Sequence, residues 1–425
     1  MRTKSKVSNQ RSAPHKGLWL ACILLLLLFF TPAVSIAGNP VEGSKAAAMG
    51  AAFVAVADDP STIAHNPAGL TNLKGTNIYG GATVMFPTTR YESPSGTSED
   101  TLHQVFLPPH FYITSYFNTE RTYFGVGVFS PFGIGGRKWS EQGLTRYAAT
   151  ESAVATLCIN PALAWKVHPR VSVGIGAFFL GEKSIAEKMV NQSALGASDG
   201  RMSLKGEGGG WGYNLGLILF PGEEFSFGLA YRSGVRVKES STLSLENIAP
   251  ALQPYFGGST FNTDADTVIH FPPVVNIGMA WRPTKSLTFS FDAEWTGWSS
   301  FDRMDLRLRK EVPQAGLTSS STSLDWKDVW VIKVGAEYQV TNQFSLRTGY
   351  AYVQSPVPES TLNPGSPEAD RHLVSVGVGY KISRFTLDAF YMADIAKKRQ
   401  VQNSTLSGKY ESFTHTIGFS VGTKY

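Results

Sequence analysis

The histidine at position 372 is the side chain with the clearest potential for catalysis, near one end of a predicted strand. As a general base in a lipid-cleaving enzyme, it would need a nucleophile such as serine beside it. No nucleophile signature accompanies it, and the sequence contains neither a Gly-rich phosphate loop nor a metal-ligand spacing. We therefore expect a protein that is not an enzyme and that uses no metal and no cofactor.

Two lysines offer a different chemistry, the binding of a carboxylate in a site shielded from water. Lys188 continues the alternation of the strand around residues 171–179 and falls on the face opposite its apolar side chains. Lys327 shares the parity of Val331 and Lys333 in a later strand. Solvation of both lysines in a water-filled interior is the alternative.

The first 37 residues read as an export signal. Basic residues precede an apolar run over residues 18–30, and Ser35, Ile36 and Ala37 provide small residues at the cleavage positions. The run is shorter than the ~20 residues of a membrane-spanning helix. This segment carries five of the 38 Lys and Arg residues and none of the 33 Asp and Glu residues. The mature chain is thus electrically neutral, which gives no support to a nucleic-acid partner.

The remainder of the chain alternates between apolar and polar residues with a period of two, which is typical of β-strands with one apolar face. The last strand places every second residue from Phe413 to Tyr425 on one side. Cys158 is the only cysteine after the signal, so no intrachain disulfide is expected.

The connections between strands are short and long in turn. Short turns are predicted at residues 118–121, 168–170, 221–223, 283–286, 341–343 and 383–384, and longer polar loops near 87–103, 137–144, 189–204, 239–266, 309–323, 354–370 and 397–408. Six turns and seven loops make fourteen strands, and such a pattern in an exported chain is typical of an antiparallel transmembrane β-barrel. A soluble β-sandwich is the alternative. Strand lengths above ten residues and aromatic residues at strand ends favour the barrel.

The segment before the strands, residues 43–73, differs from everything that follows because it is rich in Ala and Gly and nearly free of charge. Asn66, Pro67 and Ala68 form a predicted tight turn, since proline fixes its own φ and restricts the residue before it. The start of an ordinary soluble domain would look similar. Within a barrel we interpret residues 38–74 as a hatch that plugs the lumen, with residues 75–425 as the wall.

The mature chain resembles the FadL/OmpP1/TodX outer-membrane transporters of long-chain fatty acids and aromatic hydrocarbons. The order of several short motifs carries this resemblance. They are Ala57, Asp58, Asp59, Asn66, Pro67 and Ala68; Trp211 with Gly212; Tyr231, Arg232 and Ser233; residues 295–299; residues 326–328; residues 355–358 with Asp370 and Arg371; and a terminal aromatic residue.

The resemblance implies a fourteen-stranded barrel with a lumenal hatch, in which Asp58, Asn66, Pro67 and Ala68 are hatch residues. It also implies lateral release of the ligand through a gap made by an inward kink of the third strand. Here that strand covers residues 122–129, and Ser130, Pro131, Phe132 and Gly133 follow it. Proline and glycine interrupt strand pairing, so we expect the gap at these four residues, although they could also mark an ordinary strand end.

The ligand implied by the resemblance is a long-chain fatty acid or a related hydrophobic compound. Lys188 matches a basic residue that meets the ligand head group in the family, and the full set of expected ligand-binding residues is Lys188, Lys327, Phe256 and Trp211. Phe256 belongs to an apolar outer loop that suggests a capture groove. A second basic position of the family falls near Thr322, which is uncharged, so an alkane or aromatic hydrocarbon is the alternative.

We further expect a monomer in the outer membrane of a Gram-negative bacterium, in contact with membrane lipid and lipopolysaccharide. A general porin is the remaining alternative, but a porin has no use for a hatch and would carry more charge on its loops.

Overall fold

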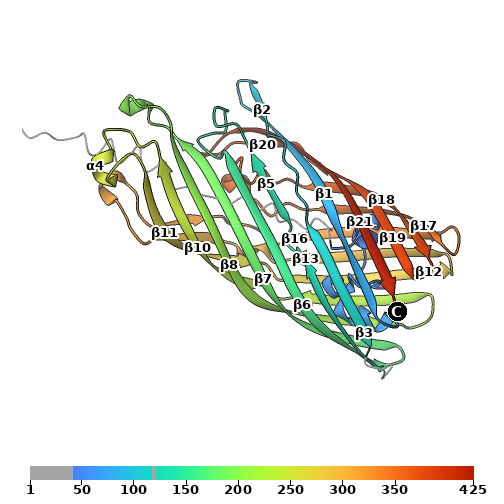
Figure 1. Ribbon diagram of the computed structural model, residues 1–425. Coiled ribbons are helices and arrows are strands. Elements are labelled where there is room, and N and C mark those ends of the chain that lie inside the picture. The colour runs from blue at the N-terminus through green and yellow to red at the C-terminus, as the bar shows by residue number, and fades with distance from the viewer. Residues whose placement is uncertain (1–41, 117–120) are drawn as a thin grey trace, which may run out of the picture.

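The computed structural model describes residues 42–116 and 121–425, and these form a closed β-barrel with a small N-terminal segment inside it (Figure 1). The predicted signal, residues 38–41 of the predicted hatch and most of the turn at 118–121 lie outside the described residues. None of the helices in the described part of the chain has the length and apolarity needed to cross a membrane.

Fourteen antiparallel strands make the wall, as the alternation of turns and loops predicts. They are β1 (Asn77–Glu92), β3 (Pro109–Tyr116), β4 (Thr122–Phe129) continued by β5 (Ile134–Lys138), β6 (Glu151–His168), β7 (Val171–Val190), β8 (Gly200–Leu219), β9 (Phe225–Arg232) continued by β10 (Val235–Glu246), β11 (Phe261–Phe271) continued by β12 (Val274–Thr284), β13 (Leu287–Thr296) continued by β14 (Arg303–Leu308), β16 (Val329–Gln339), β17 (Phe344–Val353), β18 (Arg371–Ile382), β19 (Phe385–Ala396) and β21 (Gly408–Lys424). Pairing of β1 with β21 closes the barrel, which leaves no open sheet edge there.

Short strands, one helix and several 3-10 turns lie at one rim of the barrel. They are β2 (Ser98–Asp100), β15 (Ser320–Ser323), β20 (Arg399–Val401), α4 (Gln253–Phe256) and four 3-10 turns, η2 (Ser193–Leu195), η3 (Trp298–Ser300), η4 (Pro313–Ala315) and η5 (Glu359–Thr361). The chain between the strands is longer at this rim than at the opposite one, which agrees with the predicted alternation of loops and turns.

The period-two alternation gives the wall an apolar outer face. In β21 the odd-numbered residues Ile417, Phe419 and Val421 are exposed, whereas Thr416 and Ser420 point inward and are buried. The outward residues are therefore the ones that meet lipid, as expected for a membrane barrel.

Several strands run further than their predicted ends. The sequence predicts loops at residues 189–204 and 239–266, but β7, β8, β10 and β11 extend into both ends of these ranges and pair in register there. These stretches are polar because the hairpins leave the apolar zone. Polarity alone does not separate such a paired hairpin from a loop.

The N-terminal segment lies in the lumen, towards the end of the barrel that also carries the C-terminus (Figure 1). We call residues 42–73 the lumenal segment. It contains α2 (Ser44–Ala48), α3 (Thr62–His65) and η1 (Pro67–Asn72). Asn66 is extended, with φ of −161° and ψ of 102°, and its side chain accepts a hydrogen bond from the Ala68 nitrogen, 3.1 Å away. The predicted turn at Asn66, Pro67 and Ala68 is thus present as the start of η1.

Small residues allow the lumenal segment to approach the wall closely. Gly349 of β17 is the clearest example, because a Cβ there would lie 2.0 Å from the Gly50 nitrogen. Alanines of α2 pack on β17, β18 and β19, among them Ala47 and Ala48, both fully buried.

Wall side chains bind the main chain of the lumenal segment from several sides. The Asp292 carboxylate of β13 accepts from the Phe53 and Val54 nitrogens at 2.8 and 3.0 Å. From β8, the Asn214 amide donates to the Ile63 carbonyl at 3.1 Å. These bonds satisfy the buried main-chain groups of a segment that pairs with no strand.

A chain of ion pairs adds to this attachment. Lys45 binds Asp58 at 2.8 Å and Glu337 at 3.2 Å, and Arg347 binds Glu337 and Asp388, both at 2.6 Å. Asp58, predicted as a hatch residue, thereby joins two parts of the lumenal segment and links them to the wall.

The third wall strand is interrupted between β4 and β5. Phe129 pairs with Cys158 and Ile134 with Ala155, so four residues of this strand face only two of β6. Residues 130–133 therefore loop into the lumen, helped by Gly133 in a left-handed conformation with φ of 80°. We call these four residues the kink.

Pairing on the other side of β5 is nearly lost. The β3–β4 ladder ends at Phe111 and Val128. Beyond it, the Leu102 nitrogen donates to the Lys138 carbonyl of β5 at 2.8 Å. The wall is thus weakly paired beside the kink, as the proline and glycine in the sequence predict.

Candidate functional site

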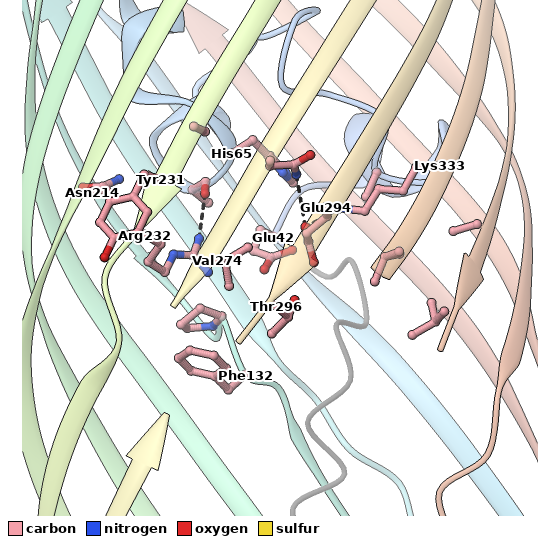
Figure 2. Close-up of a pocket in the computed structure, with 18 of the residues that line it drawn as sticks. Glu42, His65, Phe132, Asn214, Tyr231, Arg232, Val274, Glu294, Thr296 and Lys333 are labelled. Atoms are coloured by element: carbon pink, nitrogen blue, oxygen red, sulfur yellow. Dashed lines mark hydrogen bonds and ion pairs between the residues drawn. The ribbon is translucent and has the colours of Figure 1, made fainter. Parts of the chain in front are cut away.

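The candidate site is a pocket in the middle of the lumen, which we call the central pocket (Figure 2). It lies between the lumenal segment, the kink and the inner faces of strands from β8 to β18. Its walls include Ala51, Ala64, Pro67, Pro131, Phe132, Ala230, Val274, Trp298, Val331, Ala351, Val353 and Leu373. Such mostly apolar walls suit a hydrophobic ligand.

Arg232, at the end of β9, is the notable cation of this pocket. Its Nη2 donates to the Ala64 carbonyl at 2.6 Å, and its guanidinium carbon lies 5.8 Å from the centre of the Phe129 ring. Within the described residues it forms no ion pair with a carboxylate. Its charge therefore remains available to an anionic group in the pocket.

The other cation of the pocket is already compensated. Lys333 of β16 binds the Glu294 carboxylate of β13 at 2.6 Å, and the Asn276 amide donates to the same carboxylate at 3.1 Å. All three side chains line the pocket, so they add polarity without net charge.

The lumenal segment contributes two titratable groups, Glu42 and His65. Burial raises the pKa of Glu42 to about 7 and lowers the pKa of His65 to about 3. His65 is therefore neutral at physiological pH. Its Nε2 atom is buried without a hydrogen-bond partner in the described part of the chain, and it packs edge-on against Phe53 with ring centres 5.4 Å apart.

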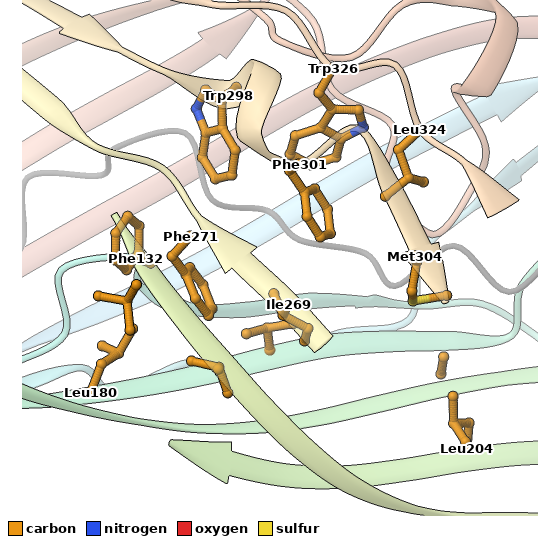
Figure 3. Packing of buried hydrophobic residues seen from close by; sticks show 14 of the residues in the cluster. Phe132, Leu180, Leu204, Ile269, Phe271, Trp298, Phe301, Met304, Leu324 and Trp326 are labelled. Carbon is orange, nitrogen blue, oxygen red and sulfur yellow. The ribbon is translucent and has the colours of Figure 1, made fainter. Parts of the chain in front are cut away.

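Aromatic side chains close the pocket towards the outer loops. The rings of Trp298, Phe301 and Trp326 contact one another with centroids 5.0 to 6.5 Å apart, and Phe132 packs on Phe271 at 4.7 Å (Figure 3). Trp298 and Phe132 also line the central pocket. The pocket thus continues into an aromatic cluster below the loops.

The structure brings together the expected hatch and gap residues. Pro67 lines the central pocket together with Pro131 and Phe132, and Asn66 lies beside Pro67. Ser130 is buried, and Gly133 lies on the wall side of the kink.

The four expected ligand-binding residues lie elsewhere. Lys188 is buried on the lumenal side of β7 but does not line the central pocket, and Lys327 is exposed in the chain before β16. Phe256 is buried in α4, against Phe261 at 5.2 Å between ring centres. Trp211 is 74% exposed on the outer face of β8, against Phe179. Its placement differs from that expected of a lumenal residue, because it shares the outward parity of Tyr213.

Sequence reasoning did not select Arg232 and Glu294 as site residues. Both had a signal in the sequence, since Arg232 belongs to one of the motifs of the resemblance and Glu294 lies on the polar face of its strand. Metal binding has no basis in the described residues, where no three His, Cys, Asp or Glu side chains are grouped suitably.

A closed barrel with a filled lumen and an apolar pocket at a break in the wall defines a class, the outer-membrane transporters of hydrophobic compounds. Residues 28–425 match the model of the family described as outer membrane protein transport protein (OMPP1/FadL/TodX). The chain belongs to this family, whose members are transporters and channels of Gram-negative outer membranes rather than enzymes.

Relatives and solved structures agree with this membership. The chain is 22% identical over 382 residues to a long-chain fatty acid transport protein of Escherichia coli, which covers 81% of this chain and 83% of that one. A Pseudomonas aeruginosa FadL homologue superposes with a TM-score of 0.80 at 19% identity, over 91% of this chain and 99% of that one. The Pseudomonas putida toluene transporter TodX gives a TM-score of 0.72 at 15% identity, over 92% and 99%.

Proposed function

We propose that this protein takes up long-chain fatty acids or related hydrophobic compounds, which are captured at the outer loops, held in the central pocket and released sideways through the wall. The observation that carries the proposal is the contact between pocket and kink. Pro131 and Phe132 interrupt the wall strand and at the same time line the pocket. A ligand in the pocket therefore lies against the weakly paired part of the wall.

Release into lipid fits the energetics of such a ligand. Each CH₂ group that leaves water for an apolar environment contributes roughly 0.8 kcal/mol. A long acyl chain that crossed a polar channel into water would lose this energy, whereas a chain that leaves through the wall keeps it.

The outer loops support the capture step. The chain between β10 and β11 buries Ile248, Leu252 and Phe256 beneath its surface, and α4 leaves Tyr255 half exposed. Apolar residues in an outer loop are costly in water unless they pack or bind. We assign Phe256 to the support of this capture surface rather than to the pocket.

The head group of a fatty acid would be bound by Arg232. A guanidinium that forms no ion pair with a carboxylate among residues 42–116 and 121–425, in a mostly apolar pocket, supports an anionic ligand. An aromatic hydrocarbon is the second candidate, because Phe132 and Trp298 offer ring faces and edges in the same pocket.

We further propose that one chain is sufficient for transport and that the exposed outer face of the wall contacts membrane lipid. Each barrel encloses its own pocket and kink, so the proposed route requires no second subunit.

The test is to restore a regular third strand. Residues 130–133 are replaced by two β-forming residues, such as Thr-Val, so that each residue of this strand faces one residue of β6. Uptake of a labelled fatty acid in cells should fall to the level of cells without the protein, whereas the heat-modifiable gel shift of a folded barrel is retained. Uptake equal to wild type at matched surface expression would rule out the lateral route.

A further inference from the structure

A second cavity lies on the other side of the kink, and we call it the wall-side pocket. Gly133 of the kink and Ile134 and Gly135 of β5 line it on one side. Met85 of β1 and Phe106, in the chain that precedes β3, line it on the other. This is the region in which β5 has almost no partner on that side. The wall-side pocket therefore lies directly behind the weakly paired part of the wall.

Phe132 separates the two pockets, because its side chain lines both. It is 6% exposed and packs against Phe271 at 4.7 Å (Figure 3). A single ring thus stands between the central pocket and the cavity behind the wall. A single aromatic side chain changes rotamer more readily than a strand moves. We therefore expect a change in the Phe132 rotamer to connect the two pockets.

The polar side of the wall-side pocket carries two arginines and two acids, all buried. Arg137 donates to the Thr89 hydroxyl and to the Gly136 carbonyl, both at 2.8 Å, and Arg371 binds the Asp394 carboxylate at 2.6 Å. Arg137, Arg371, Glu368 and Asp394 are between 3% and 8% exposed, and all four line the pocket. The two positive and two negative charges cancel.

One acceptor in this group lacks a donor. The Asp394 Oδ1 atom is buried and has no hydrogen-bond partner among the described residues, although the side chain is only 3% exposed. A buried carboxylate oxygen without a donor is costly. A ligand that donates a hydrogen bond there would remove this cost.

We infer that the wall-side pocket is a second ligand subsite, which takes an apolar molecule with an uncharged head group that both donates and accepts hydrogen bonds, such as a hydroxyl or a protonated carboxyl. This inference rests on the proposed lateral route. The head donates to Asp394 and accepts from Arg137, while the chain lies along Met85, Phe106 and Phe132. An ionised head is disfavoured because it would leave one uncompensated charge in a buried cluster that is already neutral.

The two pockets then select different forms of one ligand class. Arg232 in the central pocket forms no ion pair with a carboxylate of the described residues and suits an anion, whereas the wall-side cluster suits a neutral head. A molecule on its way to the lipid therefore binds the wall-side pocket, the last position on the proposed route, in its uncharged form.

The experiment uses the full-length protein in isolated outer membranes and two photoreactive probes, a diazirine-bearing 1-dodecanol and the matching dodecane. Cross-linked residues are mapped by mass spectrometry and assigned to the central or the wall-side pocket. We expect dodecanol to label both pockets, and dodecane to label the wall-side pocket about tenfold less than dodecanol does. In Arg137→Met, wall-side labelling by dodecanol should fall about tenfold, and central labelling should not change.

Arg232→Met is the matched control, because it removes a half-buried arginine from the central pocket and leaves the wall-side cluster intact. Asp394→Asn provides a conservative second variant in case Arg137→Met does not give the gel shift of a folded barrel. It keeps the shape of the side chain and should also lower wall-side labelling by dodecanol.

Label in the central pocket alone would overturn the second subsite and leave the proposed function standing. Equal wall-side labelling by the two probes, or labelling that survives both variants, would overturn the recognition of a head group. Absence of label from both pockets of the wild type would count against the proposed function itself, and with it against the inference that rests on it.

Discussion

Arg232 and Ala64 connect the pocket to the lumenal segment. The guanidinium donates to the Ala64 carbonyl at 2.6 Å, one residue before the neutral His65. The same cation that lines the central pocket therefore also binds the main chain of the lumenal segment. An anion that binds Arg232 competes for the donor on which that attachment depends.

Replacement of Arg232 by methionine should weaken the binding of a fatty acid. A hydrogen bond to a charged group contributes about 1.5–3 kcal/mol, which corresponds to roughly 10- to 100-fold in affinity. Competition with a fluorescent fatty acid measures the change. Lys188→Met is the control, since Lys188 is buried on the same side of the wall but does not line the central pocket. If the two variants behave alike, the head group does not bind at Arg232.

Asn66→Ala should loosen the lumenal segment without unfolding the barrel. The Asn66 side chain donates to the carbonyls of Val54 and Leu217 at 2.9 and 3.1 Å and accepts from the Ala68 nitrogen at 3.1 Å. Loss of these bonds removes about 0.5–1.5 kcal/mol each. Ion conductance in planar bilayers should rise and become noisier. A conductance trace identical to wild type would show that this turn does not control the lumen.

Gly349→Ala tests the close approach of the segment to the wall. The new Cβ would lie 2.0 Å from the Gly50 nitrogen, so the segment must shift, at a cost of about 1–3 kcal/mol. Gly181→Ala is the matched control in a wall strand, because a Cβ there meets its nearest atom only at 3.8 Å. We expect increased conductance from the first variant alone. Equal conductance of the two variants would show that the lumenal segment does not depend on close packing at Gly349.

Docking of the lumenal segment should be tighter at pH 5 than at pH 8. Burial raises the pKa of Glu42 and of Asp59 to about 7, so both acids favour docking when protonated and lose this contribution as pH rises to 7. His65, with its pKa lowered to about 3, acts in the opposite direction below pH 6.5. The net uptake of about one proton on docking changes the docking equilibrium roughly tenfold per pH unit between pH 5 and 6.5.

Conductance measured across this range checks the pH prediction. In Asp59→Asn a single acid remains to oppose His65, so the dependence below pH 6.5 should become nearly flat. A conductance that rises as the pH of wild-type protein is lowered would contradict the assignment.

Much of the wall could be predicted from the sequence because alternation reports directly on which side faces lipid. The odd-numbered residues of β21 are outward, as the pattern indicated, and the same reasoning places Lys188 inward. For Trp211 the motif and the alternation of the strand give different predictions. Its motif suggested a ligand residue, although its parity with Tyr213 and Leu215 already placed it outside.

The central pocket could not be predicted in the same way. Arg232 was visible within a motif, but its role depends on Ala64, a residue 168 positions away that no strand pairing brings near it. Likewise, proline and glycine indicated where the third strand breaks, but not that Phe132 would turn inward between two cavities. Contacts made by a segment without regular pairing leave no periodic signal.

The wall residues that contact the lumenal segment come from distant parts of the chain, and this affects the order in which the parts of the protein fold. Gly349, Asp292 and Asn214 belong to three strands synthesised long after the segment itself. These contacts cannot all form until the three strands have taken their places in the wall. We therefore expect the segment to be synthesised before the wall and to reach its final position only after these strands have folded.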